Sequence, residues 1–281
     1  MKISIPQQPE RVPRYGARAV PVVPGRIAAM LLAGAAFVAC WLIAGRLRTV
    51  VDYPLIRALN AALPLPPDAD LALAWLTTYY LFTGVLFMAL IWYCWFACPD
   101  ARARASVLCG TVAAFLAGIA GRFLQLALPT HARPLHDAAL GMMFGAIDPA
   151  ELNHWSAFPS DHAAVQFGLA AVVLLLRRRL GVAALIWAAL LNLVRVHLGV
   201  HYPTDVLGGA ALGVLAVLLA QGVAAAPAGA TLTGWERRAP GGFHAVAFFL
   251  SYNIATLFDE ARTGALATLR LLHHLLGHGD A

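Results

Sequence analysis

The stretch from Arg177 to Leu198 reads RRRLGVAALIWAALLNLVRVHL, and it decides the fold. Three arginines precede a run of about 20 mostly apolar residues, which is the length of a helix that crosses the hydrocarbon core of a bilayer. Five further apolar segments lie outward from this run along the chain. The six expected spans cover residues 27–45, 71–97, 106–128, 162–176, 180–198 and 205–225.

The composition agrees with a membrane protein. Hydrophobic residues make up 60% and charged residues 12% of the 281 residues, whereas a soluble domain has about 25% charged residues. We therefore expect an all-α protein, a six-transmembrane helix bundle formed by residues 27–226. The net charge of +6 comes almost entirely from arginines in short segments between apolar runs. No basic patch with interleaved aromatics occurs, so nucleic acid is not the expected partner; membrane lipids are.

The arginines predict an orientation, because short loops rich in Arg and Lys tend to stay cytoplasmic. If six helices cross, the arginine-bearing segments fall on one side: residues 1–26, Arg102 and Arg104, Arg177 to Arg179, and Arg237 and Arg238. We expect segment 1–26 to be cytoplasmic. Residues 46–70, the loop 129–160 and the turn 199–204 then lie on the opposite side. The compact composition rich in Ala and Arg favours a bacterial inner membrane, which makes that side periplasmic.

The C-terminal residues 227–281 read as a linker and an amphipathic tail. Prolines and glycines between Ala226 and Gly242 predict the linker. The apolar run 245–258 is about 14 residues long, which suits an interfacial or packed helix better than a seventh span. Leucines at 266, 269, 272 and 276 recur near helical spacing and predict an amphipathic helix on the membrane surface.

Three polar islands interrupt the apolar sequence on the predicted periplasmic side. They are LPTHARP at 128–134, FPSDH at 158–162 and RVHLGVHYPTD at 195–205. Ionisable groups at membrane depth are costly to bury, so Arg122 and Arg195 within the spans are functional candidates. The ordinary structural alternative is an arginine that extends to the membrane interface.

The residue types in the islands suit phosphoryl transfer. His201 and Asp205 are four residues apart, so a carboxylate can orient an imidazole if the turn continues into a helix. His162 supplies a second imidazole, so that one can attack phosphorus and the other protonate the leaving group. Arg133 and Arg195 can hold the equatorial phosphate oxygens. Ser160 is placed to cap a helix whose N-terminus attracts anions. Each residue alone also has an ordinary structural explanation; together they indicate a site.

The order of the islands, Arg-Pro, Pro-Ser-x-His and Arg-x5-His-x3-Asp, resembles the type 2 phosphatidic acid phosphatase (PAP2) family. The resemblance is close over residues 122–205. It implies His201 as the nucleophile, Asp205 as its orienting group and His162 as the acid. It also implies a phosphohistidine intermediate, a phosphorylated lipid as the substrate, and no metal or cofactor.

Three positions depart from the family pattern. The usual motif lysine falls on Leu126, and Arg122 and His131 are the candidates to take over its phosphate contact. Asp161 stands where the family usually has glycine, and Val194 stands where it usually has serine. The expected phosphate-binding residues are Arg133, Ser160, Asp161, Arg195 and Arg122.

The sequence also allows other functions. A vanadate-dependent haloperoxidase has a similar site, but its relatives are soluble. The pairs His197 with His201 and His274 with His278 have metal-ligand spacing without a convincing third ligand. A non-catalytic lipid-phosphate binder or a transporter would need the arginines but not two placed imidazoles. The motifs indicate a phosphate and leave open the lipid, which includes phosphatidic acid, phosphatidylglycerophosphate, polyprenyl diphosphate and phosphorylated glycolipids.

Overall fold

The computed structural model describes residues 25–98, 100–129, 131–148, 156–224 and 227–256. Every regular element in these residues is a helix, which confirms the predicted all-α class. In chain order they are α1 (Arg26–Leu42), η1 (Ile43–Leu47), α2 (Arg48–Ala62), α3 (Pro67–Thr78), η2 (Leu81–Val85), α4 (Leu86–Ala97), α5 (Ala101–Ala127), η3 (Pro134–His136), η4 (Ala138–Leu140), α6 (Asp161–Leu176), α7 (Arg178–His197), α8 (Pro203–Ala224), α9 (Pro227–Arg238) and α10 (Pro240–Ala255).

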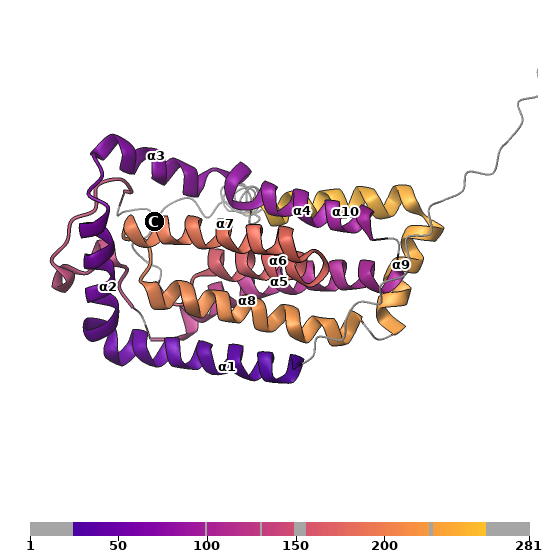
Figure 1. Cartoon of the computed structure of the whole chain (residues 1–281), viewed down its shortest axis with the longest axis horizontal. Coiled ribbons are helices and arrows are strands. Elements are labelled where there is room, and N and C mark those ends of the chain that lie inside the picture. Colours follow the sequence, from indigo (N-terminus) through magenta and orange to yellow (C-terminus); the bar gives the residue numbers. More distant parts are fainter. Residues whose placement is uncertain (1–24, 99, 130, 149–155, 225–226, 257–281) are drawn as a thin grey trace, which may run out of the picture.

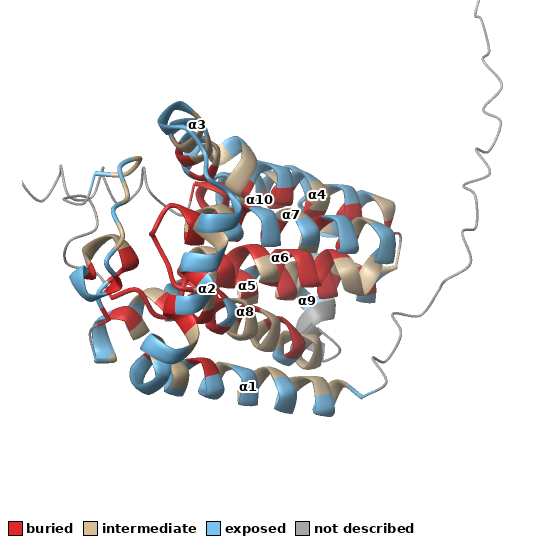
Figure 2. Ribbon diagram, turned by 60° about the vertical axis from the view of Figure 1, so that its left-hand side comes forward, coloured by how far each residue is buried: buried red, intermediate tan, exposed pale blue. Residues whose placement is uncertain are grey.

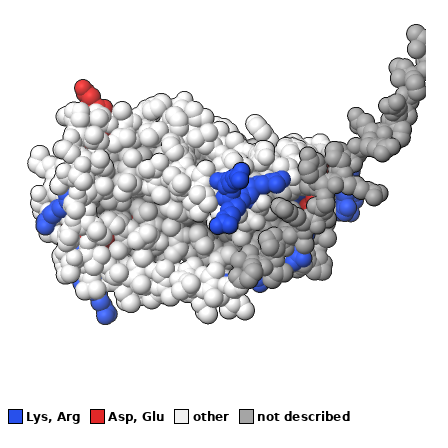
Figure 3. All heavy atoms as spheres, in the orientation of Figure 1, with Lys and Arg blue, Asp and Glu red and all other residues white. Residues whose placement is uncertain are grey.

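The bundle is built around α6. Helices α5, α7 and α8 lie along it, with α1 and α4 farther out (Figure 1). Figure 2 shows α6 almost entirely buried, whereas α1 and α3 carry many exposed residues. Exposed apolar residues such as Leu32 and Trp75 suit contact with lipid. On the face seen in Figure 3, wide areas carry no charged side chain. The apolar helices and the largely uncharged surface therefore identify the chain as an integral membrane protein.

Close glycine contacts join α6 to α8. A Cβ added to Gly209 would lie 2.1 Å from the Ser160 carbonyl oxygen, and one on Gly213 would lie 2.0 Å from that of Ala164. Small residues at this four-residue spacing let helix backbones approach closely in a membrane. The approach brings the starts of both helices together, and the Ser160 N–H donates to the Asp205 carbonyl at 3.0 Å.

The predicted count of six spans is not confirmed. Four helices in the described part are long and apolar enough to cross, namely Arg26–Ala62, Ala101–Ala127, Arg178–His197 and Pro203–Gly222. A fifth span results if Pro67–Thr78 and Leu81–Ala97, bent by 51° at their break, are counted as one. The expected span at 162–176 is α6, which has 16 residues. Other helices surround α6, so its length does not have to match the thickness of the lipid.

Helix α2 lies across one end of the bundle (Figure 1). It falls in the segment 46–70, which the hydropathy had placed between spans. Asp52, Tyr53 and Ile56 are buried, and their spacing puts them on one helical face. This face covers the end of the bundle where the third polar island lies.

The residues predicted to form a linker are helical instead. Within 226–242, α9 runs from Pro227 to Arg238 and α10 begins at Pro240. Glu236 of α9 accepts two hydrogen bonds from Arg104 of α5, at 2.9 and 2.7 Å. In α10, Phe243 stacks on Trp95 of α4 with ring centroids 5.3 Å apart. These long-range contacts outweigh the local preference of Pro and Gly for loops. The predicted tail helix at 266–276 and nearly all of segment 1–26 lie outside the described residues.

Candidate active site

The turn between α7 and α8 carries His201. Helix α7 ends at His197, and Gly199 adopts a φ of +74°, a conformation that favours glycine. Pro203 then starts α8, since proline suits the first turn of a helix. The turn predicted from Gly199 and Pro203 is present. It gives the two histidines separate partners, because His197 Nε2 contacts Asp70 of α3 at 2.9 Å.

The His201 ring is held by its Nδ1 edge. Nδ1 lies 3.0 Å from the Ala157 carbonyl oxygen and 3.7 Å from Asp205 Oδ2. Both neighbours are acceptors, so Nδ1 carries the proton and Nε2 keeps its lone pair. Nε2 lies 3.4 Å from Arg133 Nη1. The carboxylate expected to orient His201 is thus beside the ring, while the hydrogen bond itself goes to the Ala157 carbonyl.

The surroundings of His201 keep its imidazole neutral. The ring is 1% exposed. Burial, and then the cations of Arg133 and Arg195, lower the pKa of His201 well below its ordinary value of 6.5. A neutral imidazole has the lone pair that a nucleophile needs at neutral pH.

Two guanidinium groups flank His201, of which Arg133 is buried and Arg195 is half-buried. Arg133 donates to the carbonyls of Val200 at 2.9 Å and Ser156 at 3.4 Å. Arg195 donates to the Thr77 carbonyl at 3.2 Å. Neither Nε finds a partner among the described residues. Buried N–H groups seldom lack a partner, so these two mark a place for an anion.

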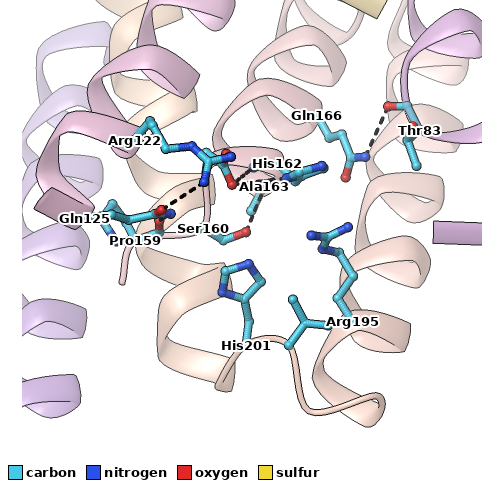
Figure 4. Close-up of polar contacts among 12 residues, drawn as sticks. Thr83, Arg122, Gln125, Pro159, Ser160, His162, Ala163, Gln166, Arg195 and His201 are labelled. Atoms are coloured by element: carbon cyan, nitrogen blue, oxygen red, sulfur yellow. Dashed lines mark hydrogen bonds and ion pairs between the residues drawn. The ribbon is translucent and has the colours of Figure 1, made fainter. Parts of the chain in front are cut away.

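The close-up in Figure 4 shows how these side chains converge. Arg195 from α7, His162 from α6 and His201 from the turn point toward a common region. The two histidines predicted from separate islands are thus brought to one site, at the end of the bundle where α2 lies.

Ser160 caps the start of α6, as expected from its place in the sequence. The Ser160 side chain caps the helix by accepting from the Ala163 N–H at 3.3 Å. The Asp161 carboxylate accepts from the His162 N–H at 2.9 Å. These side chains occupy two of the first-turn donors, and Ser160 acts as the N-cap of α6.

The Asp161 carboxylate also binds two side chains. Its Oδ2 pairs with Arg122 of α5 at 2.6 Å, and its Oδ1 lies 3.1 Å from His162 Nδ1. Arg122 therefore reaches the site from one turn before the missing lysine position, Leu126, which is exposed. The other candidate, His131, is buried against Phe158, with ring centroids 6.5 Å apart.

Sequence reasoning missed a hydrogen-bond network that supports the His201 turn. The hydroxyls of Tyr53 and Tyr202 donate to Asp137 Oδ2 at 2.6 and 2.7 Å, and Arg48 lies 3.4 Å from the same oxygen. Burial raises the pKa of Asp137, but these hydrogen bonds and the Arg48 cation outweigh it and lower the pKa. In the sequence, the residue that could have pointed to this network is Tyr202, which directly follows His201.

No group of three or more His, Cys, Asp or Glu side chains within the described ranges could hold a metal ion.

Comparisons with known proteins agree with the resemblance. Over 63 residues the chain is 40% identical to the bacitracin transport permease protein BcrC of Bacillus licheniformis. Over 58 residues it is 43% identical to the lipid A 4'-phosphatase of Bacteroides thetaiotaomicron. The matches cover 22% and 20% of this chain, and 31% and 26% of the relatives, so the chain spans less than a third of either. No solved structure matches the chain.

Residues 106–225 match the PAP2 superfamily. The matched region includes Arg133, His162, Arg195 and His201, the four side chains that meet at the end of the bundle. The predicted resemblance to the PAP2 family is thereby confirmed over this matched region.

Proposed function

We propose that the chain is an integral membrane phosphatase that removes the terminal phosphate of a lipid phosphate or lipid diphosphate. The reaction passes through a phosphohistidine on His201 and needs no metal ion. The observation that supports this most is the neutral His201, whose Nε2 lies beside Arg133 while the Nε atoms of Arg133 and Arg195 lack partners among the described residues.

In the first step, the Nε2 lone pair of His201 forms a bond to phosphorus while the bond from phosphorus to the leaving oxygen breaks. His162 donates a proton to that oxygen. The Ala157 carbonyl and the Asp205 carboxylate stabilise the positive charge that develops on the His201 ring. Arg133 and Arg195 bind the phosphoryl oxygens as charge spreads over them.

In the second step, water attacks the phosphohistidine. The bond between phosphorus and Nε2 breaks and its electron pair returns to His201. The proton from water goes to His162, which is then ready to act as an acid again. Inorganic phosphate leaves. Arg122, Ser160 and Asp161 complete the proposed site by supporting phosphate binding and the position of His162.

The lipid class is supported by one of the similar proteins, whose name describes a phosphatase that acts on lipid A. The other similar protein has a transport name, which favours the second candidate, a non-catalytic binder or transporter of lipid phosphates. We place the site on the periplasmic side of a bacterial inner membrane. The arginines of α9 and of the junction between α6 and α7 lie toward the opposite end from α2, as the positive-inside rule requires.

The deciding experiment measures phosphate release from a panel of phosphatidic acid, phosphatidylglycerophosphate, polyprenyl diphosphate and a phosphorylated glycolipid. The variants are wild type, His201→Ala and, as a matched control at the other end of the bundle, His244→Ala. We expect release by wild type and His244→Ala, and none by His201→Ala. A quenched reaction should contain a phosphoryl group on the protein that acid removes and alkali does not. Binding without release by the wild type would favour the binder instead.

A further inference from the structure

Asp161 uses both carboxylate oxygens within the chain. Oδ2 pairs with Arg122 at 2.6 Å, while Oδ1 contacts the backbone N–H of His162 at 2.9 Å and its Nδ1 at 3.1 Å. The residue is 8% exposed. These contacts fix the carboxylate on two sides, from α5 and from the start of α6, and direct it to the Nδ1 edge of His162.

An ionised carboxylate only accepts hydrogen bonds. The contact with Asp161 therefore requires a proton on His162 Nδ1 and turns Nε2 away from Asp161. Figure 4 shows the Arg195 guanidinium on the side of the His162 ring that faces the site. The proton that the acid gives to a leaving group then comes from Nε2.

The charges around His162 explain why it needs a carboxylate. Burial of the ring, and then the cations of Arg195 on α7 and Arg122 on α5, disfavour a protonated imidazole. The Asp161 carboxylate acts in the opposite direction. Arg122 in turn stabilises Asp161 as an anion. Arg122, Asp161 and His162 thus form a chain of contacts that runs from α5 to the acid.

We propose that Asp161 is the positioning residue of the acid, which fixes the tautomer of His162 and favours its protonated form, and that it makes no contact with the phosphate. This inference rests on the proposed function. It also replaces the sequence-based expectation that Asp161 binds phosphate, because both of its oxygens are engaged with the chain and its negative charge would repel an anion.

A plain structural role for Asp161 is the competing explanation. A carboxylate in the first turn of a helix interacts well with the helix dipole, and its pair with Arg122 joins α5 to α6. Substrates with different leaving groups separate the two roles. A lipid phosphate releases an alkoxide that needs a proton, whereas p-nitrophenyl phosphate releases a stable phenolate that does not.

The experiment compares Asp161→Asn with wild type on both substrates in detergent. Asn keeps the shape of the side chain and removes its charge. We expect kcat on the lipid phosphate to fall by about 100-fold, as for loss of general acid catalysis, with little change in KM. Turnover of p-nitrophenyl phosphate should fall far less, and this turnover also reports that the variant is folded. Equal losses on both substrates would overturn the proposal.

Two further variants complete the design. His162→Gln should show the same dependence on the leaving group in the first step, measured as the rate at which the phosphohistidine forms, because its role in the second step is common to both substrates. Adding Asp161→Asn to it should cause no further loss on the lipid phosphate. Arg122→Gln removes the other half of the ion pair. Because Arg122 also serves phosphate binding, it should lower the turnover of p-nitrophenyl phosphate, which Asp161→Asn largely spares. If Asp161→Asn lowers the turnover of p-nitrophenyl phosphate as much as Arg122→Gln does, Asp161 is only part of a salt bridge. If His201→Ala still releases phosphate, the proposed function fails whatever Asp161 does.

Discussion

Asp52 of α2 holds Thr204 at the start of α8, although 152 residues separate them in the sequence. The carboxylate accepts from the Thr204 N–H at 3.1 Å and from its hydroxyl at 2.6 Å. Asp52 is fully buried, and Thr204 directly precedes Asp205. The crossing helix α2 therefore stabilises the turn that presents His201.

Replacing Asp52 with Ala should destabilise the fold and weaken catalysis. The change leaves two buried donors of Thr204 without their acceptor, and we expect a loss of about 3 kcal/mol in the free energy of unfolding. Titration with SDS measures this value, and phosphate release measures the effect on the turn. Asp68→Ala, which removes an exposed carboxylate of α3, is the control and should leave both quantities unchanged. Equal stability of the two variants would contradict the role of Asp52.

Gly209→Ala should separate the starts of α6 and α8. The added Cβ would lie 2.1 Å from the Ser160 carbonyl oxygen, so a backbone has to move, and overpacking of this kind costs about 2 kcal/mol. Because Ser160 precedes Asp161 and His162, turnover should fall as well. Gly34→Ala in α1 is the control, since nothing lies within 4 Å of its added Cβ. Thermal unfolding in detergent and phosphate release test the pair. The idea is wrong if Gly209→Ala matches Gly34→Ala in both.

The polar islands could be predicted because arginine and histidine are conspicuous in apolar sequence. The partners of those residues could not. The acceptor for His201 Nδ1 is the backbone carbonyl of Ala157, and any residue can supply a carbonyl. The pairing of Asp161 with Arg122 depends on how α5 packs against α6, which hydropathy does not record.

The same reason applies to the C-terminal part of the fold. Helix α10 packs on α4 through contacts such as the hydrogen bond from Trp92 Nε1 to Ser251 Oγ at 3.1 Å, far apart in sequence. Local Pro and Gly content pointed to a linker before it. Hydropathy likewise records the apolar character of α6, but not that its 16 residues are enclosed by neighbouring helices.

The lowered pKa of His201 predicts how stability depends on pH. The unfolded chain binds a proton on this residue below pH 6.5, whereas the folded chain keeps the ring neutral until a much lower pH. Stability from this group is therefore fully present above pH 6.5 and declines as the pH falls toward the folded pKa. Unfolding of wild type and His201→Gln, compared at neutral and mildly acidic pH, isolates the effect. The wild type should lose more stability on acidification; parallel losses would show that His201 is protonated in the fold.

Chelation should not affect turnover. The proposed reaction uses His201 and the arginines for the work that a metal ion would do on a phosphate. His197 and His201 have the spacing of metal ligands, but they have separate partners. His197 binds Asp70, and His201 binds the Ala157 carbonyl. We expect the same rate of phosphate release before and after treatment with EDTA. A loss of activity that added divalent ions restore would revive a metal-dependent mechanism.

Arg133→Lys should impair the chemical step more than the fold. Arg133 uses Nη1 and Nη2 to reach the Val200 and Ser156 carbonyls, and it still has its unpartnered Nε and a place 3.4 Å from His201 Nε2. Lysine keeps the charge but cannot make this forked set of contacts. We expect kcat/KM for the lipid phosphate to fall by about 100-fold. Arg57→Lys is the matched control, because Arg57 also donates to a backbone carbonyl, that of Leu140 at 2.6 Å, and lies over the Tyr53 ring, and neither residue belongs to the proposed site. If both lysine variants keep wild-type kcat/KM, charge alone suffices at Arg133 and its planar geometry plays no part in phosphoryl transfer.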